Sequence, residues 1–339
     1  MKRKLLQKLA ISAMLGLILP ALTATIVGSA GTNPAQPETT QVTDVAHLPT
    51  ETAAEAATEM PAEMAADPTV RVITADGAQD MALETYITGV VLGEMPAYFE
   101  PEALKAQAVV ARTYTLRALY TGGKHADGAV CTDSSCCQAY CSAADYLACG
   151  GSEEDLEKIA SAVAATYHEV LSYGGEPIEA TYFACSGGKT EDAAAVWGSE
   201  VPYLLSVDSP GEEFAASYTN TVEFTYAEFA DALGLALSGS AASWFGSTSY
   251  TAGGGVDTME IGGVTFSGTQ LRSLLGLNST AFTVQLRSNA IAITTSGKGH
   301  RVGMSQYGAD AMALAGSSYE EILFYYFTGV SLDKWENFL

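Results

Sequence analysis

Residues 102–120 read EALKAQAVVARTYTLRALY, and this stretch decides how the rest of the chain is organised. It follows Pro101, it is rich in strong helix formers, and it stops before the Gly122–Gly123 pair. A proline at the start and glycine just past the end are the usual limits of a helix. The stretch therefore predicts a long helix around which other elements pack.

One face of this helix is expected to pack inward. Arg112 sits off that face and could point into a groove. The approximate stripe that defines the face consists of Ala103, Ala106, Val110, Tyr114 and Arg117.

Helical and strand patterns alternate on both sides of the central stretch. VRVIT (70–74) predicts a short strand, and MALETYITGVVLGEM (81–95) carries apolar residues at helical spacing. Ser152–Thr166, with three acidic residues in its first turn, predicts a second helix. A last helix over Ser305–Leu314 leads into YEEILFYYF (319–327).

The second half of the chain is dominated by strand signals. EVLSYGG (169–175), PIEATYFAC (177–185) and PYLLSVD (202–208) each predict a strand. About 211–293 mixes the short helix YAEFADALG with glycine-punctuated strands, which suggests a smaller β-rich lobe or insertion. The fold class is therefore α+β: helices and antiparallel strands form one grooved domain, residues 69–339, with a smaller lobe.

The N-terminal region has a different character. Basic residues precede an apolar run from Leu9 to Val27, so residues 1–30 predict a membrane anchor or a signal segment. We expect retention in the cell membrane as a single span, with the domain outside the cytoplasm; cleavage would leave a secreted protein. Residues 31–68 hold Pro, Thr, Ala and acidic residues, which predicts a disordered acidic stalk.

The charge balance excludes one class of partner. The chain has 39 Asp and Glu residues against 16 Lys and Arg, a net charge of −23. Such a surface will not bind nucleic acid, anionic wall polymers or lipid headgroups through charge alone.

Glu94 is the first candidate for chemistry. Apolar residues surround it in the sequence, and a carboxyl group near apolar neighbours has a raised pKa that suits a general acid. The plain alternative is a solvated residue that ends a helix. Near the C-terminus, KGHRVGMSQYG (298–308) places His300 between glycines and next to a predicted helix start, with Gln306 in its first turn.

Cysteines cluster in HADGAVCTDSSCCQAYCSAADYLAC (125–149). Export permits disulfides, but adjacent cysteines suit tetrahedral zinc better than two bridges from so short a loop. Both interpretations stay open, with a further disulfide between Cys141 and Cys149 and a buried Cys185. The small-residue turn at 186–190 is not a phosphate loop, because it lacks the GxxxxGK[ST] spacing.

Four blocks resemble the stage II sporulation protein D family in its order and spacing. They are VLGEMPAYFEPEALKAQAVVARTYTLRAL, YFACSGGKTEDAAAVWG with VPYLLSVD, LRSLLGLNSTAF, and GHRVGMSQYGADAMALAGSSYEEILFYYFTGV. The resemblance implies a membrane-anchored lytic transglycosylase that cuts peptidoglycan during engulfment in sporulation, preferring glycan strands stripped of stem peptides. It also implies two partners, stage II sporulation protein P, an amidase, and stage II sporulation protein M, a membrane scaffold.

The resemblance also implies roles for particular residues. Glu94 would be acid and then base, with no cofactor needed for catalysis, and a structural Zn²⁺ would be held by His125, Cys131, Cys136 and Cys137. The family usually has glycine where this chain has Arg301. The residues expected to bind the glycan are Arg112, Tyr182, Ser186, Lys189, Thr190, His300 and Gln306.

Two other functions remain open beside the lyase. One branch of the fold family consists of non-catalytic modifiers of wall amidases, which would use the same groove to present glycan. A zinc hydrolase is the poorer alternative, because the sequence has no HExxH motif or open ligand set.

Overall fold

The computed structural model describes residues 67–339 apart from 76, 124 and 127–129. The predicted anchor, residues 1–30, and nearly all of the predicted stalk, residues 31–68, lie outside these residues. Across the part of the chain that the structure describes, every helix is too short or too polar to cross a lipid bilayer.

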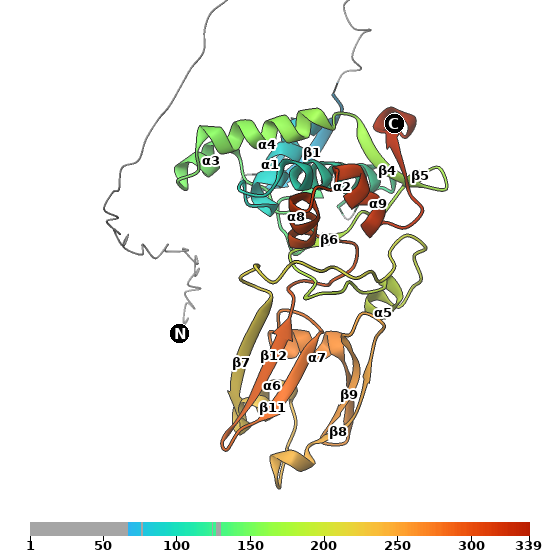
Figure 1. The fold of residues 1–339 in the computed structure, drawn as a ribbon. Coiled ribbons are helices and arrows are strands. Elements are labelled where there is room, and N and C mark those ends of the chain that lie inside the picture. Colours follow the sequence, from blue (N-terminus) through green and yellow to red (C-terminus); the bar gives the residue numbers. More distant parts are fainter. Residues whose placement is uncertain (1–66, 76, 124, 127–129) are drawn as a thin grey trace, which may run out of the picture. The chain divides into compact units, whose positions relative to one another are not determined.

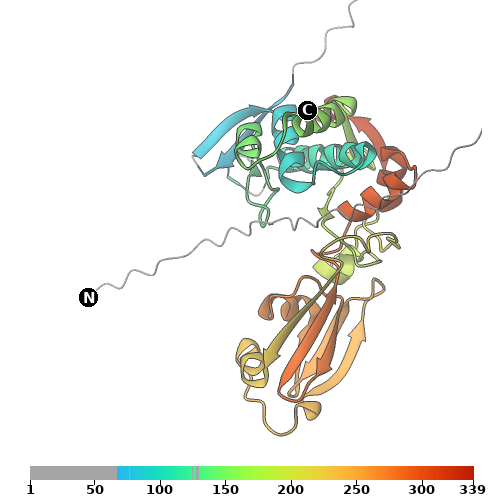
Figure 2. The same cartoon turned by 60° about the vertical axis from the view of Figure 1, so that its left-hand side comes forward.

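The central helix forms as predicted. α2 (Pro101–Tyr120) begins with proline in its first turn and is buried on nearly every face. Glycine follows its end at Gly122, which has a positive φ. The elements packed against it are α1 (Leu83–Glu94), α4 (Glu153–Ala165), β4 (Glu169–Tyr173), α8 (Gln306–Leu314) and α9 (Tyr319–Tyr326). Figures 1 and 2 show these helices gathered in one cluster.

Serine residues fix where several of these helices start. Ser152 caps α4 and exchanges hydrogen bonds with Asp155, while Ser305 caps α8 by accepting from the Gly308 N–H. Such caps satisfy N–H groups that have no partner inside the helix. The predicted limits of both helices agree with the structure to within one residue.

Short strands surround the helical cluster. β1 (Thr69–Thr74) pairs with β2 (Gly77–Ala82) and with β3 (Val130–Cys131), and β4 lies between β5 and β14. The other short elements are α3 (Ala143–Ala148), β5 (Glu176–Pro177), β6 (Tyr182–Phe183), α5 (Ala193–Trp197), β13 (Met304–Ser305), β14 (Ser331–Lys334) and the 3₁₀ helix η2 (Trp335–Asn337).

Two of the predicted strands are mostly absent. Within 177–185 only Pro177 and the two residues of β6 pair as strands, and 202–208 contains none. Side chains hold the second segment instead: the Ser206 N–H donates to Asp192 at 2.6 Å, and the Val207 N–H donates to the Thr190 hydroxyl at 2.8 Å. An apolar run predicts burial, but it does not reveal which partner satisfies the backbone.

A second hydrophobic core lies in the segment from Phe229 to Ile293. Two three-stranded antiparallel sheets, ordered β11-β12-β7 and β10-β9-β8, enclose it with two helices (Figure 1). We call this β-rich part the small lobe. Its elements are β7 (Thr219–Thr225), α6 (Tyr226–Leu233), the 3₁₀ helix η1 (Ala241–Ser243), β8 (Phe245–Tyr250), β9 (Val256–Ile261), β10 (Val264–Ser267), α7 (Gly268–Leu274), β11 (Phe282–Leu286) and β12 (Ala290–Ser296).

Helices and mostly antiparallel sheets together confirm the predicted α+β class. The predicted boundaries of the smaller lobe, about 211–293, stay a prediction, although its strands and core fall close to them.

Candidate active site

A cavity of about 1220 Å³ is lined by four of the residues predicted for catalysis and glycan binding. Glu94, at the end of α1, lines it together with Tyr182, His300 and Gln306. The cavity is large enough for several sugar rings, because an ordinary small-molecule pocket is roughly 300–1,000 Å³.

Glu94 is half-buried and accepts a hydrogen bond from the Ala139 N–H at 2.6 Å. Burial is the main cause of a raised pKa for its carboxyl group, and hydrogen bonds from Ala139, Tyr182 and Gln306 offset this in part. All three donors are neutral groups. The carboxyl group is therefore held in place without a positive charge that would keep it ionised.

Gly93 allows the Ala139 N–H to reach the carboxylate. A Cβ atom at this position would lie 2.9 Å from the Tyr140 nitrogen and 3.0 Å from the Ala139 carbonyl carbon. Both are backbone atoms, so neither could move aside as a flexible side chain would. The glycine next to Glu94 thus allows the backbone of residues 139–140 to pack closely against α1.

Two further chain segments meet at the cavity wall. β13 pairs in parallel with β6, and Gly303 at φ +84° makes room, since a Cβ there would lie 2.2 Å from the Thr181 carbonyl oxygen. Gln306 follows β13, and its side-chain amide donates to the Glu94 carbonyl oxygen at 3.2 Å. The C-terminal motif is thereby tied to α1.

His300 is neutral at physiological pH. Burial, and then the positive charge of Arg272, lower its pKa to about 4. Its Nδ1 accepts from the Val302 N–H at 3.1 Å, so the proton is on Nε2. Its ring contacts Phe183 and Trp197. A histidine held in this way positions neighbouring groups and does not deliver protons.

Arg301, where the resemblance implies glycine, adopts φ +67°, a region that favours glycine. Its buried side chain donates to the backbone oxygens of Ser186, Lys189 and Gly253, each at 2.7 Å. It also forms an ion pair with Glu191 at 3.2 Å. These contacts offset the backbone strain and hold the 186–190 turn to the 297–303 loop.

The expectation that Arg112 points into the groove is wrong. Its side chain is 0% exposed and forms a two-pronged ion pair with Glu84, both contacts at 2.7 Å. It donates further to the backbone oxygens of Glu169 and Val163. Arg117, which belongs to the predicted inward stripe, lines the cavity instead. Because α2 is buried all round, its apolar pattern does not identify a single inward face.

The 186–190 turn does not line the cavity either. Ser186 is fully buried and bonds to Glu212 through its N–H and its hydroxyl. Thr190 is buried against Val207, and Lys189 lies 3.8 Å from Asp208 in an exposed ion pair. Within the described chain none of these three predicted glycan-binding residues is in the cavity wall.

Several cavity residues escaped the sequence analysis. They carry no local motif and come together only through the fold. Aromatic side chains suit the faces of sugars, and cations suit acidic groups on them. The missed residues that bear on ligand binding are Glu179, Trp197, Tyr203, Arg272, Asn278 and Lys298.

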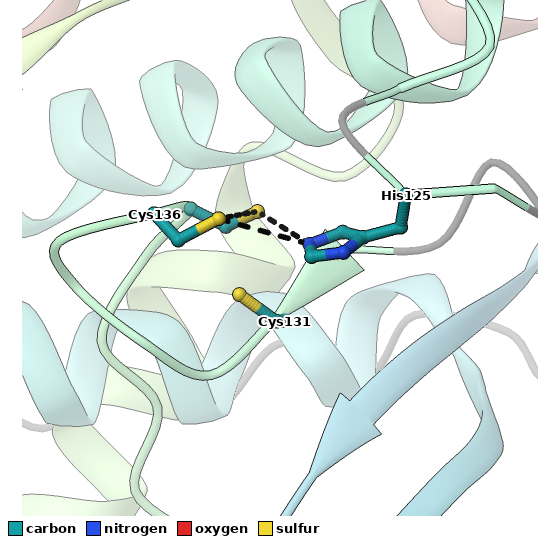
Figure 3. Close-up of side chains that lie close together, drawn as sticks. His125, Cys131 and Cys136 are labelled. Atoms are coloured by element: carbon teal, nitrogen blue, oxygen red, sulfur yellow. Dashed lines mark hydrogen bonds between the residues drawn. The ribbon is translucent and has the colours of Figure 1, made fainter.

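His125, Cys131, Cys136 and Cys137 lie together next to the same cavity. One ligand atom from each lies within 4.8 Å of the others, and Figure 3 shows the imidazole and the sulfur atoms facing one another. Three sulfurs and one nitrogen at this spacing fit a tetrahedral ion after a small contraction, with Zn–S of about 2.3 Å and Zn–N of about 2.0 Å. The cluster can hold a metal ion, and Cys136 and Cys137 also line the cavity.

The predicted disulfide is not present. All six cysteines are free, Cys141 is half-buried and Cys149 is exposed. Cys185 is fully buried, as predicted, and its thiol lies 3.0 Å from a Glu212 oxygen.

Comparison with known proteins gives a consistent result. The family model described as SpoIID, stage II sporulation protein, matches residues 74–173. Stage II sporulation protein D of Bacillus subtilis (strain 168) is 42% identical over 266 residues, which cover 77% of each chain. The protein of the same name from Bacillus amyloliquefaciens is 40% identical over the same length. A more distant relative, an amidase enhancer of Bacillus subtilis, is 29% identical over 74% of this chain and 40% of its own.

Proposed function

Because this chain belongs to the stage II sporulation protein D family, we propose that it is a lytic transglycosylase that cuts the glycan strands of peptidoglycan during sporulation. Glu94 supports this proposal most strongly, because its carboxyl group has a raised pKa and is held by neutral donors in the wall of a large cavity. Glycosidic bond cleavage needs such a proton donor.

The reaction needs only one carboxyl group. Protonated Glu94 gives its proton to the glycosidic oxygen as the bond to the muramyl C1 breaks. The carboxylate then takes the proton of the C6 hydroxyl while that oxygen bonds to C1, which closes a 1,6-anhydro ring. A hydrolase would use a second carboxylate to activate water or to form a covalent intermediate.

The other cavity residues would position the glycan. The Tyr182 hydroxyl and the Gln306 amide lie next to Glu94, and neutral His300 lines the same cavity, so all three can offer hydrogen bonds without a competing charge. Trp197 and Tyr203 offer aromatic faces on which sugar rings can stack.

We propose that the His125–Cys137 cluster holds a structural zinc ion. A closed set of four ligands leaves no position for substrate, so the ion would fix the fold of the segment and take no part in the chemistry. Ala139, two residues beyond Cys137, donates to Glu94. The cluster would thus hold the backbone donor that orients the acid.

The cellular setting is also a proposal. Residues 1–30 would anchor the domain to the outer side of the cell membrane. An amidase, stage II sporulation protein P, would act first by removing stem peptides, and stage II sporulation protein M would serve as the scaffold. Co-purification of both proteins with the full-length chain, lost on deletion of residues 1–30, would support this arrangement.

Mass spectrometry of the products tests the proposed reaction. The full-length chain is incubated with peptide-stripped glycan beside a Glu94→Gln control. Ends of 1,6-anhydro-N-acetylmuramic acid that disappear in the control are the expected result. Reducing ends would instead indicate a hydrolase.

One relative favours a second candidate function. The similarity to an amidase enhancer allows a non-catalytic role in which the cavity presents glycan to an amidase. Glycan that binds but stays intact, together with a faster amidase reaction in the presence of the chain, would support this alternative.

A further inference from the structure

The cavity carries a charge pattern that the acidic chain as a whole does not. The net charge is −23, yet three cations line the cavity, Arg117, Arg272 and Lys298. Its carboxylates in the described chain are two, Glu94 and Glu179. Arg117 is paired with Glu176, which does not line the cavity, so Arg272 and Lys298 remain as the cations available to a ligand. Available cations in a cavity of an otherwise acidic chain favour an anionic group on the ligand.

Arg272 stands apart from the other cations. Arg117 is already paired with Glu176 at 3.1 Å, and the Lys298 side chain is largely in water. Arg272, in the last turn of α7, is half-buried, and among the described residues its guanidinium has neither a hydrogen bond nor an ion pair. A partly desolvated guanidinium with five unused N–H donors is costly unless a ligand satisfies it.

Arg272 and His300 lie near each other in the cavity wall. The charge of Arg272 acts on His300, whose ring lies 5.5 Å from that of Trp197. Asn278 and Lys298 line the same cavity with it. An anionic ligand group on the His300 side of the cavity would therefore lie near the charge of Arg272.

We propose that Arg272 binds the free lactyl carboxylate of an N-acetylmuramic acid residue in the glycan strand. This inference rests on the proposed function, because it names the recognition group of the same site. In intact peptidoglycan the lactyl carboxyl forms a neutral amide with the peptide. Hydrolysis of that amide leaves a carboxylate, which a guanidinium binds through two parallel hydrogen bonds.

Binding of two matched glycans tests the proposal. The full-length Glu94→Gln chain, which leaves glycan uncut, is titrated with peptide-stripped glycan and with the same glycan after its carboxyl groups are converted to methylamides. We expect the methylamide form to bind about tenfold more weakly, the usual effect of losing a hydrogen bond to a charged group. Equal affinity for the two glycans would overturn the proposal.

Substitution of the arginine identifies the group responsible. Adding Arg272→Gln should abolish the preference by weakening binding of the carboxylate form alone. Arg287→Gln is the matched control, because Arg287 belongs to the same lobe, is paired with Glu223 and does not line the cavity. A preference that survives in Arg272→Gln would contradict the assignment. If that variant fails to fold, Arg272→Lys, which should retain a reduced preference, takes its place.

Cleavage by the wild-type chain separates this inference from the proposed function. If glycan is bound with a carboxylate preference but never cut, the proposed lyase activity is contradicted and the proposed role of Arg272 is supported. Cleavage of both glycans with equal kcat/KM would support the lyase activity and contradict the role of Arg272.

Discussion

Arg112 in the helical core and Arg272 in the cavity wall place the same guanidinium in opposite surroundings. Arg112 is fully buried, and its donors meet Glu84 and the backbone oxygens of Glu169 and Val163. Arg272 is half-buried and, among the described residues, has no such partner. A charge whose partners belong to the chain holds the fold together. A charge without them is available to a ligand.

The carboxylates repeat the contrast. Glu84 is held by a cation, whereas Glu94 accepts only from neutral donors. A neighbouring cation stabilises the ionised form of a carboxyl group, and burial without one favours the protonated form. The same residue type thus serves as an anchor in the core and as an acid at the cavity.

Loss of the acid should have the largest effect. Glu94→Gln removes the transferable proton but keeps an oxygen that can accept from Ala139. Cleavage should fall by about 10²–10⁴-fold, the usual share of general acid–base catalysis. Product release from defined glycan gives the rate, and thermal unfolding shows that the variant is folded. Cleavage within tenfold of the wild type would mean that another group is the acid.

Loss of the core arginine should mainly reduce stability. Arg112→Met leaves the half-buried Glu84 without its ion-pair partner, so the free energy of unfolding should fall by about 3 kcal/mol, the lower end of the range for a fully buried pair. Arg117→Met is the control, because its ion pair with Glu176 is largely exposed and should cost less than about 1 kcal/mol. Denaturant titration measures both. Similar losses in the two variants would break the contrast between core and cavity.

The pH dependence follows from the raised pKa of Glu94. The proton donor is the protonated form, so kcat/KM should fall as pH rises through that pKa, about tenfold for each further pH unit. The midpoint should lie above the ordinary glutamate value of about 4.3. A rate that rises over this range would show that the reaction starts from the carboxylate.

Loss of the metal cluster should have a smaller effect on cleavage. Cys137→Ser removes one ligand from the segment that leads to Ala139, and we expect cleavage to fall by about tenfold as the donor to Glu94 becomes less well fixed. Bound zinc, measured by elemental analysis, should fall with it. The control is Cys149→Ser, at an exposed position outside the cluster. Unchanged cleavage in a zinc-free Cys137→Ser chain would show that the cluster does not influence Glu94.

Local signals in the sequence were sufficient to predict α1, α2, α4, α6 and α8, but not the other helices of the described chain. Ser152 with Asp155, Pro101 and the turn around Ser305 fix helix ends through contacts a few residues away, and the structure keeps these ends. The strand predictions failed where the residues that bind the backbone are distant in the sequence. The 202–208 segment is held by Asp192 and Thr190, which no pattern within the segment could indicate.

The site divides in the same way. His300 and Gln306 belong to a compact motif and reach the cavity as expected, and the four metal-cluster residues come together. The prediction that Arg112 points into the groove failed because, in a helix buried on nearly all sides, the spacing of apolar residues does not show which way a side chain points. Arg272 and Trp197 come from segments without a motif, so only the folded chain brings them to the cavity.

The most direct test of a single acid uses Glu179, the other carboxylate that lines the cavity in the described chain. A hydrolase would need such a partner, whereas a transglycosylase does not. If Glu94 is the single acid, Glu179→Gln should cut peptide-stripped glycan at a rate within about twofold of the wild type and still yield 1,6-anhydro ends. A loss as large as that of Glu94→Gln, or products with reducing ends, would contradict it.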